Sequence, residues 1–183
     1  MNNNCVEPHL IFSVPIWGYV LNRENYHLKD YVEYVLELEK NETSIVKSNF
    51  GGFQSRDNLN EEPIFQELVE TLTTMAQNSL SKKLRLTELW ANVNHYKDFN
   101  GAHTHGGYVS GVFYLTTPEN CGNLILCNPN VRSDVTLFRS DNYCIKPQEL
   151  ACIIFPSWLE HYVEPNLSDE PRISMSFNFE ILP

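Results

Sequence analysis

From about residue 86 onward, the chain is a series of short apolar or alternating runs separated by turn residues. The runs cover residues 89–96, 110–116, 123–127, 134–138, 149–155, 161–163 and 172–180, and Gly and Pro punctuate the segments between them. Seven or eight short strands at such intervals are typical of antiparallel sheets packed face to face. The second half of the chain is therefore predicted to form a sandwich or jelly roll.

The first half has a different pattern. Residues 10–20 are apolar and rich in β-branched and aromatic side chains, which predicts an opening strand. Residues 25–40 and 58–84 carry apolar side chains at helical spacing and predict two amphipathic helices, joined by an exposed loop at 48–58. A length of 183 residues with 42% hydrophobic content fits one domain, 1–183, in which 1–85 supports a jelly-roll core at 86–183. The predicted fold class is mainly β with N-terminal helices.

The last run alternates strictly between polar and apolar side chains. One face carries Arg172, Ser174, Ser176 and Asn178, and the other carries Ile173, Met175, Phe177 and Phe179. The polar face must look into a wet or ligand-filled interior. An inward guanidinium needs a partner for its charge, and carboxylates and phosphates match its geometry. An internal ion pair or a solvated edge strand is the alternative reading of Arg172.

Three histidines predict a catalytic metal site. His103 and His105 are two residues apart in a Gly-rich segment before the strand at 110–116, so on an extended chain they point to the same side. His161, on a distant strand, can complete one face of a metal ion and leave the other face open. Judged alone, His161 is equally compatible with a core histidine beside Trp158.

Composition makes several classes of partner unfavourable. A net charge of −10 and a pI near 5.0 disfavour a grip on nucleic acid. The start of the chain lacks the basic and long apolar regions of a signal peptide, and no apolar run approaches the length of a membrane span. Five cysteines without a CxxC pair predict free thiols in a cytoplasmic protein.

The order of His103, His105, His161 and Arg172 resembles that of the iron(II)/2-oxoglutarate-dependent dioxygenases. Residues 48–55, 90–94, 103–115, 155–163 and 172–178 are also similar to a group of 2-oxoglutarate oxygenases of marine bacteria and phages. The resemblance implies a double-stranded β-helix, a jelly roll of the cupin type. It further implies iron(II) as cofactor, 2-oxoglutarate and dioxygen as co-substrates, and hydroxylation of a substrate that the sequence does not reveal.

The resemblance also implies roles for single residues. His103, His105 and His161 would hold the metal, and Arg172 with Ser174 would bind the far carboxylate of 2-oxoglutarate.

The DNA-dealkylating branch of the superfamily has an Asn-x-Tyr motif that touches the co-substrate, and this carries over to Asn94 and Tyr96. Tyr114 is a further candidate for a hydroxyl that reaches the same carboxylate. For Tyr96 and Tyr114, a place in the core of the sheet is an equally good reading.

The sequence departs from the superfamily at His105, where most members have a carboxylate. Three neutral imidazoles would leave the metal with one more positive charge, so zinc or nickel would compete more easily with iron. In an alternative arrangement, only one of His103 and His105 binds the metal while the other faces the substrate.

Two other functions remain open. The first is a three-histidine cupin-type dioxygenase that does not use 2-oxoglutarate, in which Arg172 would hold the substrate's carboxylate. The second is a non-catalytic metal-binding jelly-roll module.

Overall fold

The computed structural model describes residues 13–22, 28–130 and 142–183. In chain order the elements are β1 (Trp17–Val20), α1 (Leu28–Asn41), β2 (Asn49–Phe50), β3 (Phe53–Gln54), the 3-10 helices η2 (Leu59–Glu61) and η3 (Pro63–Phe65), α2 (Gln66–Leu80), β4 (Leu84–Asn94), β5 (Phe99–His103), β6 (Val109–Thr116), β7 (Leu124–Leu126), β8 (Tyr143–Ile145), β9 (Ala151–Pro156), β10 (His161–Val163) and β11 (Arg172–Ile181). The strand predicted at 134–138 lies outside the described residues.

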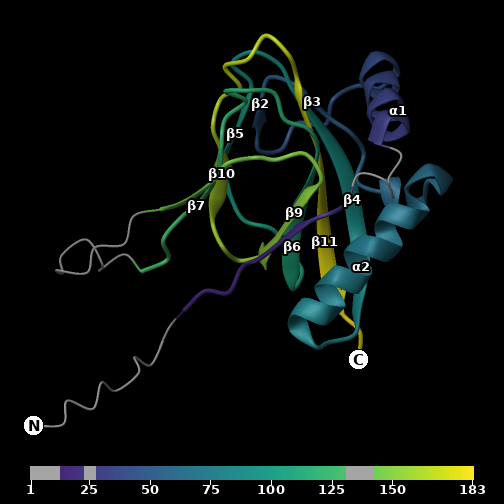
Figure 1. Cartoon of the computed structure of the whole chain (residues 1–183), viewed down its shortest axis with the longest axis vertical. Coiled ribbons are helices and arrows are strands. Elements are labelled where there is room, and N and C mark those ends of the chain that lie inside the picture. Colours follow the sequence, from purple (N-terminus) through teal and green to yellow (C-terminus); the bar gives the residue numbers. More distant parts are fainter. Residues whose placement is uncertain (1–12, 23–27, 131–141) are drawn as a thin grey trace, which may run out of the picture.

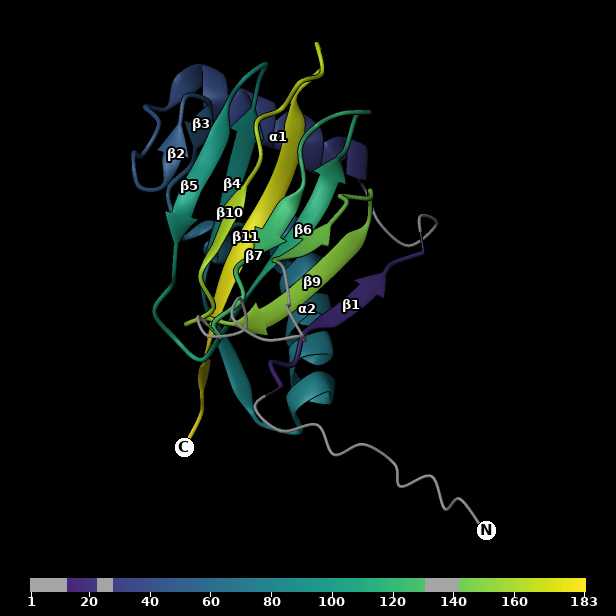
Figure 2. The ribbon, with the colours of Figure 1, turned by 90° about the vertical axis from the view of Figure 1, so that its left-hand side faces the viewer.

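Two antiparallel sheets form the body of the molecule. A six-stranded sheet has the order β1-β9-β6-β11-β4-β3, and a five-stranded sheet has the order β2-β5-β10-β7-β8. Figure 1 shows the two sheets facing each other, with both helices on the outer side of the six-stranded sheet. In Figure 2 the five-stranded sheet lies in front of the other. The predicted mainly β jelly roll is confirmed.

The apolar face of β11 packs against the helices. Ile173, Met175, Phe177 and Phe179 are at most 1% exposed and join one core cluster with side chains of α1 and α2. Full burial of such a side chain contributes roughly 1.5–3 kcal/mol, so this face fixes the orientation of the whole strand. The opposite face of β11 therefore points into the space between the two sheets.

The helices differ from the prediction at their ends. Residues 59–65 form two 3-10 turns, and α2 begins only at Gln66. Pro63 lies at the start of the second turn, and proline restricts the residue before it to extended backbone, which interrupts a helix. Within the described residues, neither helix has the length and apolar character of a membrane span.

A β-bulge interrupts the pairing of β4 with β11. Asn178 pairs with Glu88 but Phe179 pairs with Leu86, so Thr87 is an extra residue on β4. The bulge changes which residues of β4 face the helices. Beyond it, the alternation of side chains between the two faces of the strand is shifted by one residue. The core side of β4 carries Leu84, Leu86, Leu89, Ala91 and Val93. Glu88, Trp90 and Asn92 line the space between the sheets instead.

Candidate active site

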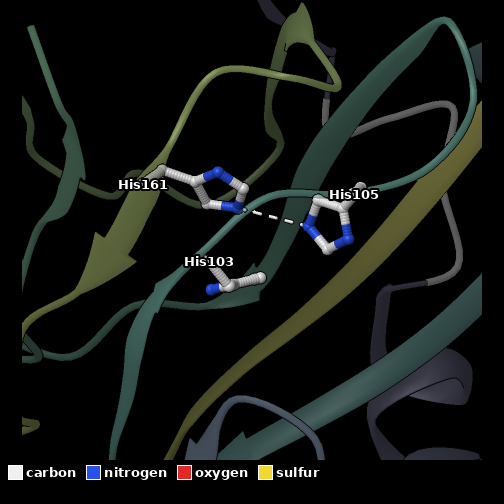
Figure 3. Close-up of side chains that lie close together, drawn as sticks. All are labelled: His103, His105 and His161. Atoms are coloured by element: carbon white, nitrogen blue, oxygen red, sulfur yellow. Dashed lines mark hydrogen bonds between the residues drawn. The ribbon is translucent and has the colours of Figure 1, made fainter. Parts of the chain in front are cut away.

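The structure brings the three predicted histidines together (Figure 3). His103 is the last residue of β5, His161 is the first residue of β10, and the two are direct partners across these neighbouring strands. His105 follows two residues after the end of β5. Their potential ligand nitrogens all lie within 4.8 Å of one another, and Nε2 of His105 is 3.2 Å from Nε2 of His161.

Hydrogen bonds to the main chain orient two of the rings. Nδ1 of His103 donates to the carbonyl of Gly101 at 2.7 Å, and Nδ1 of His161 donates to the carbonyl of Leu159 at 2.8 Å. A carbonyl only accepts, so the ring proton is on Nδ1 in both histidines. Each Nε2 is therefore unprotonated and turns its lone pair towards the shared space, which is the tautomer that a metal ligand needs.

Burial keeps the three imidazoles neutral. It lowers the pKa of His103, and it lowers the pKa of His161 to about 4. Burial also lowers the pKa of His105 to about 3, with smaller contributions from the charges that His161, His103 and Lys47 would place nearby. Because a metal binds the neutral form, the cluster does not need to lose protons at neutral pH before it binds one.

In the described part of the chain, no carboxylate joins the histidines. Among the described residues, the metal-ligating side chains that converge here are these three alone. The departure at His105 is therefore not offset by an Asp or Glu of the described ranges. Imidazole nitrogens suit iron(II), and equally zinc, nickel and copper, so the donor set fits a divalent transition metal.

A cavity of about 700 Å³ lies between the two sheets, with the histidines in its wall. The predicted polar face of β11 lines it, as do facing residues of β4 and β6. This volume is within the usual range for small-molecule sites and exceeds what a short dicarboxylic acid alone would fill.

Arg172 lies in the wall of the same cavity and is only 1% exposed. Its Nη1 donates to the main-chain carbonyl of Cys121 at 2.5 Å, with those of Gly122 and Glu164 at 3.4 and 3.5 Å. Its Nη2 is buried and has no hydrogen-bond partner among the residues that the structure describes. Within residues 13–22, 28–130 and 142–183 no carboxylate pairs with Arg172, and it does not reach solvent, so neither alternative reading is found. A buried guanidinium in this state is costly unless an anionic ligand completes its bonding.

Two other predicted residues lie beside Arg172. Ser174 faces the cavity from the same strand, and Tyr114 on β6 is its direct cross-strand partner. Tyr114 is buried, which raises its pKa, and its hydroxyl is close enough to Arg172 for the two groups to interact electrostatically. Asn94 is the cross-strand partner of Arg172 on β4 but does not line the cavity. Its side-chain amide donates to Asn100 at 3.5 Å.

Tyr96 lies elsewhere, contrary to the expectation that it shares a strand face with Asn94. β4 ends at Asn94, and the chain turns through Lys97, whose φ is 71°. Tyr96 is 54% exposed, has the ammonium of Lys97 above its ring, and does not line the cavity. The alternation that would have aligned it with Asn94 does not continue through a turn.

Sequence reasoning missed several residues of the cavity wall. The Gly-rich segment before the strand at 110–116 was not predicted to follow a separate strand, but β5 occupies 99–103 and carries His103 at its end. From the loop at 48–58, Ser48 places its hydroxyl 3.5 Å from Nε2 of His103 and accepts from Asn100 at 3.3 Å. Trp90 also lines the cavity, with its ring 5.5 Å from that of His105. The density of Gly, Asn and Ser around Ser48 was the only signal for this wall.

The jelly roll and the histidine cluster in its cavity fit a metal-dependent enzyme of the non-haem class. A family model described as "Putative 2OG-Fe(II) oxygenase" matches residues 88–178, about half of the chain. The chain belongs to this family of iron(II)- and 2-oxoglutarate-dependent oxygenases, as the resemblance in sequence predicted. Its cofactor is iron(II), and 2-oxoglutarate and dioxygen are its co-substrates.

Solved structures show the same fold at low sequence identity. The 2-oxoglutarate-dependent epimerase SnoN from nogalamycin biosynthesis is 15% identical, with a TM-score of 0.73 over 91% of this chain and 77% of that chain. A prolyl-4-hydroxylase from Pseudomonas putida is 12% identical, with a TM-score of 0.69 over 93% and 95%. HygX from Streptomyces hygroscopicus, solved with nickel, 2-oxoglutarate and hygromycin B, is 13% identical, with a TM-score of 0.66 over 91% and 83%. No curated protein matches the chain significantly in sequence.

Proposed function

We propose that this oxygenase is a hydroxylase with a three-histidine iron site. His103, His105 and His161 would hold iron(II) through their Nε2 atoms. Arg172 would bind the far carboxylate of 2-oxoglutarate, with the hydroxyls of Ser174 and Tyr114 beside it. Asn94, the cross-strand partner of Arg172, adjoins this end of the cavity, and we leave Tyr96 out of the site.

The unpaired Nη2 of Arg172 carries the proposal. It is a buried hydrogen-bond donor on a charged group, and it lies in the wall of the cavity that also contains the histidine cluster. Main-chain carbonyls already orient Nη1, so the guanidinium is held in place while one side remains for a ligand. A carboxylate accepts from a guanidinium in a planar, paired geometry, which a fixed fork is suited to bind.

When bound, iron(II) and 2-oxoglutarate would activate dioxygen, which is the oxidant and the source of the oxygen atom that converts a C–H bond into C–OH. The chain's own residues would bind the metal and 2-oxoglutarate, orient them and shield them from water. Phe155 packs its ring 4.7 Å from that of His161, and Leu124 and Val163 add apolar surface to the same wall. This surface limits the access of water to the metal side of the cavity, which strengthens the charge interactions made there.

We also propose that residues 1–183 act as one catalytic domain in the cytoplasm. The free thiols of Cys121, Cys127, Cys144 and Cys152 support a reducing compartment. The net charge of −10 argues against a nucleic-acid substrate.

Succinate release tests the proposed function. Iron(II)-loaded protein is incubated with 2-oxoglutarate and dioxygen, and succinate is followed alongside direct calorimetric binding of 2-oxoglutarate. We expect binding together with slow succinate release in the absence of a primary substrate. The matched control is His95→Ala, which changes a histidine paired with Glu39 at the surface. Metal binding without binding of 2-oxoglutarate would instead favour the three-histidine dioxygenase that does not use this co-substrate.

A further inference from the structure

We infer that Glu88 recognises the primary substrate, and that this substrate carries a protonated amine or guanidinium group. The inference rests on the proposed function, because it assigns the part of the cavity that 2-oxoglutarate does not need. It concerns the end of the cavity opposite Arg172.

Glu88 and Arg172 mark two ends of one continuous cavity. On β11, Arg172 pairs with Asn94 of β4, while Asn178, six residues further along, pairs with Glu88. At about 3.3 Å per residue, these two positions are roughly 20 Å apart. Trp90 lies between them on β4, and its ring faces that of His105 at 5.5 Å. The histidine cluster therefore faces a cavity with a cationic end and an anionic end.

The bulge at Thr87 aims Glu88 into the cavity. Leu84 and Leu86 face the helices, so uninterrupted alternation would also turn residue 88 towards the helices. The extra residue reverses this, and the Thr87 hydroxyl donates to the main-chain carbonyl of Asn178 at 3.2 Å beside the bulge. Bulges commonly redirect a side chain next to an active site.

A buried polar network fixes the Glu88 carboxylate in place. The side-chain amide of Asn178 donates to Oε2 of Glu88. Ser110 donates its hydroxyl to Oδ1 of Asn178 at 2.6 Å, and the hydroxyl of Ser157 lies 2.9 Å from that of Ser110. Asn178, Ser110 and Ser157 are all buried, so the amide is held with its NH₂ group towards Glu88.

Among the described residues, the charge of Glu88 has no counterpart. In the described part of the chain no cationic side chain pairs with it, and no protein group donates to its Oε1. The other charged residues that line the cavity in the described ranges are Lys47 and Arg172. Lys47 pairs with Asp57 at 3.4 Å, and Arg172 is at the far end. An anionic co-substrate is therefore favoured near Arg172 and disfavoured near Glu88, where a cation is favoured.

The test compares a cationic probe with its neutral analogue. The dissociation constants of n-pentylammonium and pentan-1-ol are measured by saturation-transfer NMR, both in the metal-free protein and in the protein loaded with manganese(II) and 2-oxoglutarate. Glu88→Gln keeps the shape and an acceptor for Asn178 but removes the charge. Glu180→Gln removes the same charge from an exposed position on β11 that pairs with Arg85, outside the cavity.

We expect n-pentylammonium to bind the wild type and the Glu180→Gln variant alike and to bind the Glu88→Gln variant about tenfold more weakly. Pentan-1-ol should not distinguish the three proteins. Glu88→Asp, which keeps the charge but withdraws it by one methylene, should weaken the ammonium probe by a smaller factor and serves if the Gln variant does not fold.

Equal binding of n-pentylammonium to wild type and to a folded Glu88 variant would overturn the inference, as would an equal response of pentan-1-ol. Binding of 2-oxoglutarate is measured in the same samples. Its failure in the wild type would count against the proposed function, while the amine titration of metal-free protein would still decide the role of Glu88.

Discussion

His103 and His161 are cross-strand partners on β5 and β10, and each donates its Nδ1 proton to the main-chain carbonyl two residues earlier in the chain. Both rings are thus held by the strands themselves, with Nε2 facing the same space. His105 lies beyond the end of β5, and the described residues provide no such hydrogen bond to its ring. Two of the three candidate ligands are therefore preorganised more strongly than the third.

This difference predicts unequal effects on metal affinity. His103→Ala and His161→Ala should each weaken manganese(II) or iron(II) binding by more than the roughly 10–100-fold that follows loss of a residue orienting a ligand. His105→Ala should weaken it less, because its ring must be ordered when the metal binds. Anaerobic calorimetry measures all three, with His95→Ala as the surface control. Equal losses at the three positions would show that the main-chain hydrogen bonds do not set the order of affinity.

His105→Asp tests the departure from the superfamily. An aspartate there would restore a charged oxygen ligand and lower the charge of the loaded site by one unit. We expect iron(II) to compete better against zinc than it does in the wild type, since imidazole-only sites favour the later metals. Competition dialysis with both metals gives the ratio directly. An unchanged ratio would indicate that position 105 faces the substrate rather than the metal.

Arg172→Lys should raise the KM for 2-oxoglutarate at least about tenfold, because lysine keeps the charge but loses the planar fork. The measurement is the 2-oxoglutarate dependence of succinate release, together with binding by calorimetry. Arg85→Lys is the matched control, since Arg85 pairs with Glu180 at the surface. Unaltered 2-oxoglutarate binding in Arg172→Lys would remove the guanidinium from the co-substrate site.

Tyr114→Phe should weaken the binding of 2-oxoglutarate without changing the stability of the fold. The ring is buried in the six-stranded sheet, and its hydroxyl belongs to the wall of the cavity, so the phenyl ring can remain in place. We expect 2-oxoglutarate to bind about tenfold more weakly, equivalent to about 1.4 kcal/mol, with the thermal midpoint nearly unchanged. A large fall in the midpoint with unchanged binding would make Tyr114 a core residue only.

The metal-free protein should lose stability as the pH falls below about 6.5. Unfolded histidines titrate near pH 6.5, whereas burial lowers the folded-state pKa of His161 to about 4 and that of His105 to about 3. The unfolded chain therefore binds more protons between pH 6.5 and 4, and the free energy of unfolding decreases across this window. Urea unfolding at several pH values should give a shallower pH dependence for His105→Asn than for wild type. The same pH dependence of the unfolding free energy in both proteins would show that the pKa of His105 is not lowered by folding.

Much of the fold followed from local pattern. The alternation in β11 correctly separated Arg172 and Ser174 from Ile173 and Met175, because one face of that strand packs on helices and the other lines a cavity. The convergence of His103 and His161 depends on pairing between strands distant in sequence, and it was inferred from residue order rather than from any local signal.

The failures also have physical causes. Tyr96 was placed on a strand because it closes the run at 89–96, but β4 ends at Asn94 and the chain turns at Lys97. β5 was missed because Asn100, Gly101 and Ala102 are weak strand formers, and their pairing with β10 and β2 overrides that preference. Glu88 was not identified, because only the bulge turns it inward. The trace of the bulge in the sequence is a one-residue shift in the spacing of the apolar side chains, from 84 and 86 to 89, 91 and 93.

The acceptors that orient His103, His161 and Arg172 are all carbonyl groups of the backbone. A change of side chain at those acceptor positions leaves the carbonyls present, provided that the strands keep their path. Mutations that reshape the surrounding walls can therefore accumulate without dismantling the reactive centre. A protein with this fold can change its substrate while the residues that hold the metal and 2-oxoglutarate keep their positions.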